Sequence, residues 1–432
     1  MPLTLILFCL SAAAIYGSCE YFVNGIEWLG RHLRLSSMAV GAVLAAFGTA
    51  LPECSVTFIA AVFGRSPADK DLGVGAALGG PLVLSTLAYA AVGIALLMNW
   101  RGLNRASCAV EVNSRSIGRD QGIFLAIFSA NLLLGLFLFP FKQIFGLILL
   151  AAYVVYVLRK MKTRDAVEDT ELEPLKIRRA HASSLGWAAA QSLLSLAVIF
   201  VASRVFVLQL GAIGAALHWP PQMAALLLSP VATELPETMN ALIWVRQGKE
   251  RLALANISGA MMIQATVPSA IGLLATPWRF DRTLTIGCLV TVASIAFLWL
   301  VFRRGTVDAR ALASVCAFYA LFAALVVHDF AHRWEHVPAA DHARANPFAS
   351  HPEAIAAGQT TYQAHCLSCH GVQARGDGVK VPSLHNANLR QASDGDIEWF
   401  LRQGVSAEGM PSWQRLSENE RWQIVAYLKS IQ

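Results

Sequence analysis

The residues Cys366, Cys369 and His370 form a Cys-Leu-Ser-Cys-His motif in the last quarter of the chain. This spacing lets two thiols bond to the two vinyl groups of a haem while the adjacent imidazole ligates the iron. A redox dithiol or half of a zinc site is the alternative for such a motif. No second cysteine pair follows, because the other cysteines all lie before residue 331. The motif therefore predicts a covalently attached c-type haem.

The residues around this motif suit a small haem-binding domain. Met410, in a Gly-Met-Pro sequence, is predicted to be the second axial ligand, whose thioether raises the reduction potential. A packing role is the alternative for this methionine. Residues 416–431 predict a closing amphipathic helix that starts with a Ser417–Glu420 capping box. The segment 353–432 resembles a small monohaem cytochrome c domain, which implies an α-helical fold that carries haem c.

A repeated motif suggests a second kind of chemistry. Residues 48–53 read Gly-Thr-Ala-Leu-Pro-Glu, and residues 232–237 read Ala-Thr-Glu-Leu-Pro-Glu. Both copies lie in apolar stretches, where a carboxylate is costly unless it faces a cavity or a partner. A glutamate buried for packing alone would explain one such residue better than two that a repeat relates. Glu53 and Glu237 are therefore predicted to bind a cation or a proton.

Helices that cross a membrane must position these glutamates. The chain has ten apolar stretches of suitable length, near residues 3–29, 36–63, 72–98, 121–140, 142–158, 183–209, 220–245, 252–276, 284–302 and 311–330. Five spans in each half would bring the second motif into the membrane from the opposite side, which is the inverted repeat common in secondary transporters. Gly48, Pro52 and Pro236 are expected to break the helices that carry the two glutamates.

Each of the two motifs is followed by a glycine-containing stretch, at residues 74–81 and 255–260. The motifs and these stretches resemble the paired motifs of the calcium/cation antiporter superfamily, which includes the sodium/calcium exchangers. The resemblance covers about residues 1–330. It implies a cation antiporter in which Glu53 and Glu237 are the central ligands. By the same resemblance, Thr49 and Thr233 would add oxygen ligands.

The chain departs from that superfamily's pattern at several polar positions. Calcium takes about six to eight oxygen ligands, and this chain has lost neutral oxygens and gained one carboxylate. Exchange of calcium or another cation against sodium, exchange against protons, and a site that no longer transports all stay open. The positions concerned are Ala50, Gly80, Leu84 and Ala260, which lack side-chain oxygens, the new carboxylate Glu234, and Gln264, which remains polar.

Two further groups are candidates for chemistry. Glu20 and Arg204 occupy equivalent places in the two repeats, which predicts an ion pair across the pseudo-twofold axis. Separate snorkelling of each side chain to the membrane interface is the alternative. His328, His332 and His336 follow one another at i, i+4 spacing at the end of the last span. That spacing can bind a transition metal, although histidines that simply face water are the alternative.

Composition and charge indicate the environment of the chain. Of its 432 residues, 56% are hydrophobic and 14% are charged, whereas a soluble domain has about 25% charged residues. With the N-terminus outside, the inner loops carry 19 Lys and Arg and the outer loops carry five, so the positive-inside rule favours this orientation. Ten spans return the C-terminus to the outside. The net charge of +6 follows from this topology and requires no nucleic acid partner.

These observations predict an all-α chain: a polytopic membrane bundle of about ten helices, built from two inverted five-helix repeats, and a small α-helical cytochrome c domain. The linker that joins the repeats is either a solvated cytoplasmic loop or a site for anionic lipid. The predicted regions are a first repeat at 1–158, the cytoplasmic linker at 159–182, a second repeat at 183–330, a second linker at 331–352 and the haem-binding domain at 353–432.

Two functions are consistent with these regions. The first is a cation antiporter of the bacterial inner membrane, with both termini and an electron-transferring haem domain in the periplasm. The second is a membrane-anchored cytochrome c, an electron carrier or respiratory-complex subunit whose transporter core no longer transports. The expected cofactor is haem c, with bound Ca²⁺, Na⁺ or another cation. The expected partners are the membrane, small cations, and respiratory electron-transfer proteins or an oxidase.

Overall fold

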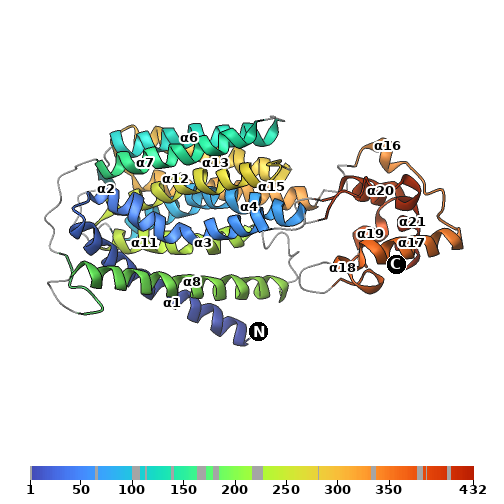
Figure 1. The fold of residues 1–432 in the computed structure, drawn as a ribbon, viewed down its shortest axis with the longest axis horizontal. Helices are drawn as coiled ribbons and strands as arrows, with labels where there is room; N and C mark the ends of the chain where they lie inside the picture. The colour runs from blue at the N-terminus through green and yellow to red at the C-terminus, as the bar shows by residue number, and fades with distance from the viewer. Residues whose placement is uncertain are drawn as a thin grey trace. The chain divides into compact units, whose positions relative to one another are not determined.

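Long apolar helices dominate the first three quarters of the chain in its computed structural model (Figure 1). The structure describes residues 2–63, 67–99, 108–111, 114–137, 141–162, 172–178, 184–216, 227–280, 282–331, 337–376, 383–385, 387–405 and 410–432. Two units can be distinguished, one made of most of residues 1–324 and the other mainly of residues 325–432. We call them the bundle unit and the C-terminal unit.

The first half of the bundle unit contains three π-helical segments, which widen the helical turn locally and are common at functional sites. Two of them flank the helix that carries the first repeated motif. The elements are α1 (Pro2–His32), α2 (Ser37–Ala39), the π-helix η1 (Val40–Ala45), α3 (Ala46–Phe58), the π-helix η2 (Ile59–Phe63), α4 (Pro67–Val83), the π-helix η3 (Leu84–Ala88), α5 (Tyr89–Asn99), β1 (Ala109–Glu111), α6 (Ser114–Leu136) and α7 (Lys142–Lys162).

The second half has a break in place of the π-helical turns. The helix that carries the second motif stops at Thr233 and starts again at Leu235, with Glu234 between the two pieces. The elements are α8 (Leu185–Ala216), α10 (Ser229–Thr233), α11 (Leu235–Arg246), α12 (Glu250–Ala275), α13 (Arg282–Phe302), β2 (Thr306–Asp308), α14 (Ala309–Ser314) and α15 (Cys316–Ala331).

The core of the bundle unit surrounds α12, which packs against α3, α6, α7, α11 and η1. Small residues allow this close packing. A side chain at Gly259 of α12 would have its Cβ 2.2 Å from the backbone oxygen of Ala42 in η1, so the two backbones meet where the repeats face each other. The loops before α6 and after α13 are joined by an antiparallel pairing of β1 with β2, with Val110 opposite Val307.

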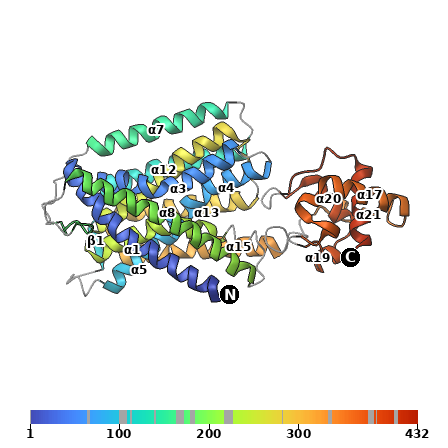
Figure 2. The same ribbon diagram turned by 60° about the horizontal axis from the view of Figure 1, so that its bottom comes forward.

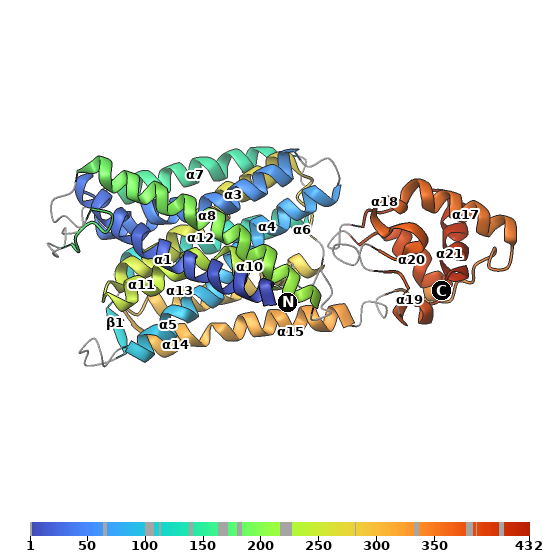
Figure 3. The ribbon, with the colours of Figure 1, turned by 90° about the horizontal axis from the view of Figure 1, so that it is seen from below.

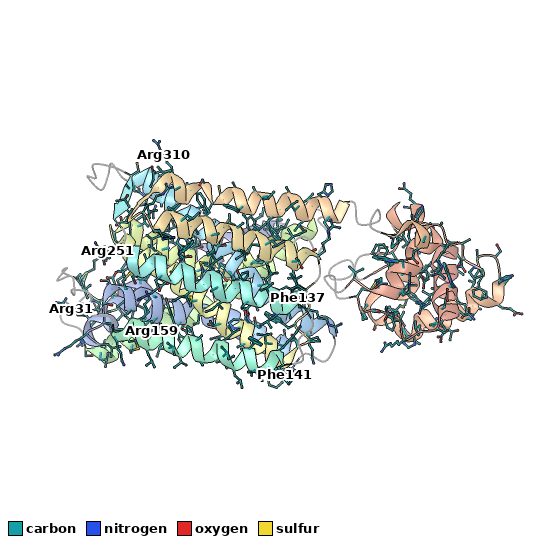
Figure 4. The ribbon with its side chains drawn as sticks, turned by 90° about the horizontal axis from the view of Figure 1, so that it is seen from above. Arg31, Phe137, Phe141, Arg159, Arg251 and Arg310 are labelled. Carbon is teal, nitrogen blue, oxygen red and sulfur yellow. The ribbon has the colours of Figure 1, made fainter. Side chains whose placement is uncertain are left out.

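Charged side chains are concentrated at one end of the bundle unit. Figure 4 shows Arg31, Arg159, Arg251 and Arg310 at this end, and Phe137 and Phe141 at the opposite end. We call the former the arginine-rich end. It holds the C-terminal ends of α1 and α7 and the N-terminal ends of α12 and α14.

Among the described residues, seven helices are long and apolar enough to cross a membrane. They coincide with seven of the ten spans expected from the sequence. The other three expected spans lie on the interrupted segment from α2 to η2, on α6, and on the broken pair α10 and α11. The helical membrane bundle is therefore confirmed, while the number of ten crossings stays a prediction.

Helices α1 and α8 lie side by side at the edge of the bundle, as Figures 2 and 3 show. They run antiparallel, because Phe8 stacks on Phe206 near one end and Trp28 packs with Ala188 near the other. Part of the expected cytoplasmic linker, residues 172–178, packs against both helices. Leu175 of this segment is fully buried with Trp28 and Ala188.

The predicted ion pair between Glu20 and Arg204 is wrong. Glu20 Oε2 lies 3.1 Å from Lys176 Nζ, and the Arg204 guanidinium lies over the ring of Phe200. The reason is geometric. Since α1 and α8 are antiparallel, Glu20 lies near the level of residue 196 of α8, about 12 Å along the helix from Arg204 at about 1.5 Å per residue.

The C-terminal unit consists of short helices around its own apolar core, which includes Tyr362, Leu401 and Trp422. Gly358 of α17 touches α21, where a Cβ would come 2.0 Å from the backbone oxygen of Gln423. The elements are α16 (Ala339–His342), α17 (Pro352–His365), α18 (Leu367–His370), the 3₁₀-helix η5 (Val372–Ala374), α19 (Ala387–Gln391), α20 (Asp394–Gln403) and α21 (Glu418–Ser430).

Part of the expected linker 331–352 packs onto this core. Arg344 pairs with Glu418 of α21 and with the fully buried Glu398 of α20. Glu398 also accepts a 2.8 Å hydrogen bond from Arg421 Nε. Asn346 Nδ2 donates to the backbone oxygen of Trp422 at 2.9 Å. These contacts hold residues 341–346 against α20 and α21.

Candidate functional sites

The break in the second repeat places two carboxylates inside the bundle unit. Proline residues cause the break locally: Pro230 lies in the first turn of α10 and Pro236 in the first turn of α11, where a missing backbone N–H is tolerated. Glu234 lies between the two helices and Glu237 in the first turn of α11. Both side chains are fully buried. The N-terminal end of α11 favours negative charge at this point.

Glu234 is joined to the glutamine predicted from the sequence. Gln264 Nε2 of α12 donates to Glu234 Oε1 at 2.7 Å. The first repeat contributes Gly80, where a Cβ would lie 2.6 Å from Glu234 Oε1 and 2.3 Å from Gln264 Oε1. A larger residue at position 80 would therefore occupy the space of this pair.

Glu237 has no hydrogen-bond partner for either carboxylate oxygen among the described residues. Thr49 of α3 is buried and lies beside this carboxylate, while its hydroxyl donates to the backbone oxygen of Ala45 at 3.1 Å. Glu53 lies on the same helix as Thr49, but its side chain falls outside the described residues. Thr233 Oγ1 is half-buried and donates to the backbone oxygen of Pro230 at 3.2 Å. The structure therefore groups Thr49 and Glu237, and separately Glu234 and Gln264.

Two buried asparagines next to Glu237 were missed by the sequence analysis. Asn256 Nδ2 of α12 donates to the backbone oxygen of Glu237 at 3.2 Å. Asn240 lies one turn after Glu237 on α11, and within the described part of the chain neither of its amide atoms has a hydrogen-bond partner. Its place one turn after Glu237 on the same helix face is the signal that could have identified Asn240.

The haem motif lies where α17 ends and α18 begins. Cys366 is buried and Cys369 is exposed. The residue after the motif, Gly371, has a φ of 71°, which glycine adopts without strain. Its backbone oxygen accepts a 2.8 Å hydrogen bond from the Tyr362 hydroxyl. This bond fixes the backbone next to His370.

Burial shifts the pKa of two groups in the haem motif. Burial raises the pKa of the Cys366 thiol to about 11. Burial also lowers the pKa of the His370 imidazole, which keeps the ring neutral and able to ligate a metal at neutral pH. His370 Nδ1 is buried and, among the described residues, lacks a partner.

Met410 and the motif contact the same apolar core. Cys366 is part of that core, and Met410, Leu367 and Leu384 pack against it. Met410 is held by two backbone hydrogen bonds with Val405, of 2.8 and 3.1 Å. These residues fit a covalent c-type haem: Cys366 and Cys369 would bond to it, and His370 and Met410 would hold its iron. Bound there, the haem supplies one-electron redox chemistry.

A family model described as "Sodium/calcium exchanger protein" matches residues 3–162 and 187–328, which is more than half of the chain. The chain belongs to the sodium/calcium exchanger family. Among its relatives is CaxA of Alkalimonas amylolytica, a protein designated an antiporter, which is 27% identical over 298 residues, or 67% of this chain and 86% of CaxA.

The fold of this exchanger-family chain also matches a solved structure. The sodium-calcium exchanger NCX_Mj, soaked with Na⁺ and Ca²⁺, superposes with a TM-score of 0.59 at 20% sequence identity, covering 74% of this chain and 97% of NCX_Mj. At this identity the similarity shows the fold alone.

The C-terminal unit has relatives of its own. A second family model, described as "Cytochrome C oxidase, cbb3-type, subunit III", matches residues 353–428. Cytochrome c-554(547) of Halothiobacillus neapolitanus is 33% identical over 86 residues, which is 18% of this chain and 94% of that cytochrome. The exchanger-family bundle is thus followed by a cytochrome c domain, and these matches imply a covalent haem c.

The predicted histidine cluster lies partly outside the described residues. His328 is on α15, whereas His332 and His336 belong to residues 332–336 that the structure does not describe. Within the described residues, no group of three or more metal-binding side chains is found. A metal at these histidines stays a prediction.

The space at Gly80 leads to a test of the Glu234–Gln264 pair. We expect Gly80→Ala to displace this pair and to weaken cation binding by about tenfold, the effect typical of losing a group that supports a metal ligand. Gly75→Ala is the matched control on the same helix, because the nearest atom to its Cβ would be 3.9 Å away. Cation-dependent thermal stabilisation of the two purified variants would show the difference. Equal stabilisation would contradict the role of the pair.

Proposed function

We propose that the exchanger-family bundle carries a cation, Ca²⁺ or another divalent ion, across the membrane in exchange for protons or sodium. Glu53 and Glu237 would be the central ligands. Thr49, Thr233, Glu234 and Gln264 would complete the site. The observation that carries this proposal is the Glu237 carboxylate: it is fully buried, and neither oxygen has a hydrogen-bond partner among the described residues.

A buried carboxylate without a partner is costly. A bound cation or a proton would remove that cost, and exchange between the two is the reaction of an antiporter. The cation is a hard ion that prefers oxygen ligands, and the amide oxygen Gln264 Oε1 is another buried atom that lacks a partner in the described part of the chain. The loss of side-chain oxygens at Ala50 and Gly80 favours protons over sodium as the counter-ion.

We further propose that the protein lies in a bacterial inner membrane with ten spans and with both termini in the periplasm. The concentration of arginines at one end of the bundle supports this orientation, because positive residues accumulate on the cytoplasmic side. Haem of the c type is attached on the periplasmic side, which agrees with a C-terminus there.

The cytochrome c domain would transfer electrons to or from respiratory proteins or an oxidase. His370 and Met410 would hold the iron, and their ligation by imidazole and thioether favours electron transfer over oxygen chemistry. In this proposal the redox state of the haem influences cation exchange.

A second candidate function is electron transfer alone, with the bundle as a membrane anchor or as part of a respiratory complex. The position of Gly80 beside Glu234 and Gln264 favours this second function, because a glycine from the first repeat contributes no side-chain oxygen to the pair.

Cation flux in proteoliposomes separates the two functions. Purified wild-type protein should take up Ca²⁺ against an opposing gradient of protons or sodium, at a rate that depends on whether the haem is reduced or oxidised. Uptake that is independent of the haem state would reject the redox influence and leave exchange intact. Absence of any uptake in both haem states would favour the electron carrier.

A further inference from the structure

Helices α11 and α12 form an antiparallel hairpin with buried polar residues at matching levels. Asn240 lies six residues before the end of α11 at Arg246, and Asn256 lies six residues after the start of α12 at Glu250. At about 1.5 Å per residue, both asparagines lie about 9 Å along their helices from the turn that joins them.

Both asparagines are fully buried and have amide atoms without partners. Asn256 uses its Nδ2 to bond the backbone oxygen of Glu237, which leaves its Oδ1 without a partner among the described residues. Asn240 has no partner there for Oδ1 or Nδ2. A buried amide left unsatisfied costs about 1–3 kcal/mol, so these oxygens are expected to be satisfied by an ion or by water.

The two asparagines lie between Glu237 and the arginine-rich end. Glu237, Asn240 and Trp244 follow one another on one face of α11, at i, i+3 and i+7. Trp244 is fully buried and donates from Nε1 to Glu27 Oε1 of α1 at 2.8 Å. The Glu27 carboxylate is paired with Lys249 Nζ at 2.6 Å. The row of polar groups from Glu237 toward the arginine-rich end therefore reaches Trp244, whose indole is bonded to the Glu27–Lys249 ion pair.

We infer that Asn240 and Asn256 form an uncharged binding site for the cation. This site lies on the side of Glu237 that faces the arginine-rich end. This inference rests on the proposed function. Amide oxygens are ordinary ligands of Ca²⁺, and they bind it more weakly than a carboxylate does. A weak site next to a strong one allows an ion to leave the strong site, as conduction requires. In this structure the buried Trp244 indole lies one turn beyond Asn240 on α11.

The test replaces Asn240 in the full-length protein. Asn240→Leu keeps the size of the side chain and removes the oxygen, so we expect the KM for Ca²⁺ uptake to rise about tenfold. Asn240→Asp keeps an oxygen and adds a charge, so we expect a lower KM together with a lower kcat. Asn24→Leu is the matched control: Asn24 is a buried asparagine of α1 whose Oδ1 is satisfied, since it accepts from Gln191 Nε2 at 2.9 Å and from the backbone N–H of Lys176 at 3.1 Å, and it should leave the KM unchanged.

A second measurement does not depend on transport. Ca²⁺ should raise the thermal unfolding midpoint of the wild type and of Asn24→Leu more than that of Asn240→Leu, because a ligand stabilises the state that binds it. If the wild type takes up Ca²⁺ and both Asn240 variants share its KM, the inference is wrong and the proposed function stands. If the wild type shows neither uptake nor a Ca²⁺-dependent midpoint, the proposed function fails and the inference fails with it. Should Asn240→Leu not fold, an unchanged KM in Asn240→Asp alone would overturn the inference.

Discussion

Glu237→Gln should reduce cation exchange by at least about 100-fold, the upper end of the losses seen when a group that supports a metal ligand is removed. Glutamine has nearly the same shape as glutamate, so the packing around position 237 stays intact. What changes is the charge. A buried cation needs a nearby negative group to offset the loss of its water shell, and Glu237 is fully buried. Uptake of Ca²⁺ into proteoliposomes measures the effect.

Glu20→Gln is the control for this substitution. Glu20 belongs to the same bundle unit, but its carboxylate is about one-third exposed and pairs with Lys176. We expect its uptake to equal that of the wild type. Equal uptake by Glu237→Gln and Glu20→Gln would contradict the assignment of Glu237 as a ligand.

The double substitution Cys366→Ser and Cys369→Ser should abolish covalent haem. The two thiols are the only atoms of the motif that can form thioether bonds, and a serine hydroxyl does not replace them. Denaturing electrophoresis followed by haem staining measures the covalently bound haem. The wild type should give a stained band at the size of the full chain, and the double variant should give none.

Cys9→Ser and Cys316→Ser supply the comparison for the haem motif. Both cysteines are exposed in the bundle unit, so their loss should leave haem staining unchanged. A stained band in the Cys366→Ser and Cys369→Ser protein would refute the attachment of haem at this motif.

Local sequence patterns were sufficient for much of the fold and for the haem site. The Cys-Leu-Ser-Cys-His motif needs only residues 366–370, and the family matches agree that a cytochrome c domain follows the bundle. The apolar spans likewise depend on composition over about 20 residues, which is why seven of the ten coincide with helices that meet the criteria for crossing. The comparison with the pattern of the antiporter superfamily singled out Glu234 and Gln264, which the structure brings together.

Features that depend on how helices face each other were harder to predict. Glu20 and Arg204 each stand at the same distance along the sequence from the motif glutamate of their own repeat. An inverted repeat, however, places equivalent residues at opposite depths in the membrane unless they lie at the midplane. Asn240 has no counterpart in the first repeat, where Val56 stands at the same offset, so the repeat did not single it out.

The contacts made by segments between helices could not be predicted from the sequence either. Residues 172–178 were expected to be part of a solvated or lipid-binding linker, yet Leu175 is buried and Trp28 Nε1 donates to the backbone oxygen of Glu173 at 3.0 Å. The charged residues around this segment obscure Leu172 and Leu175, the two leucines that pack it against Trp28 and Ala188. Such contacts arise from the antiparallel packing of α1 with α8, which no pattern in the linker specifies.

The most direct test of cation exchange by this chain is the uptake of Ca²⁺ into proteoliposomes that contain the wild-type protein, driven by an opposing gradient of protons or sodium. We predict uptake above that of protein-free liposomes, and its loss in Glu237→Gln measured in parallel. Wild-type uptake equal to that of protein-free liposomes under both gradients would contradict the exchange of calcium through Glu237.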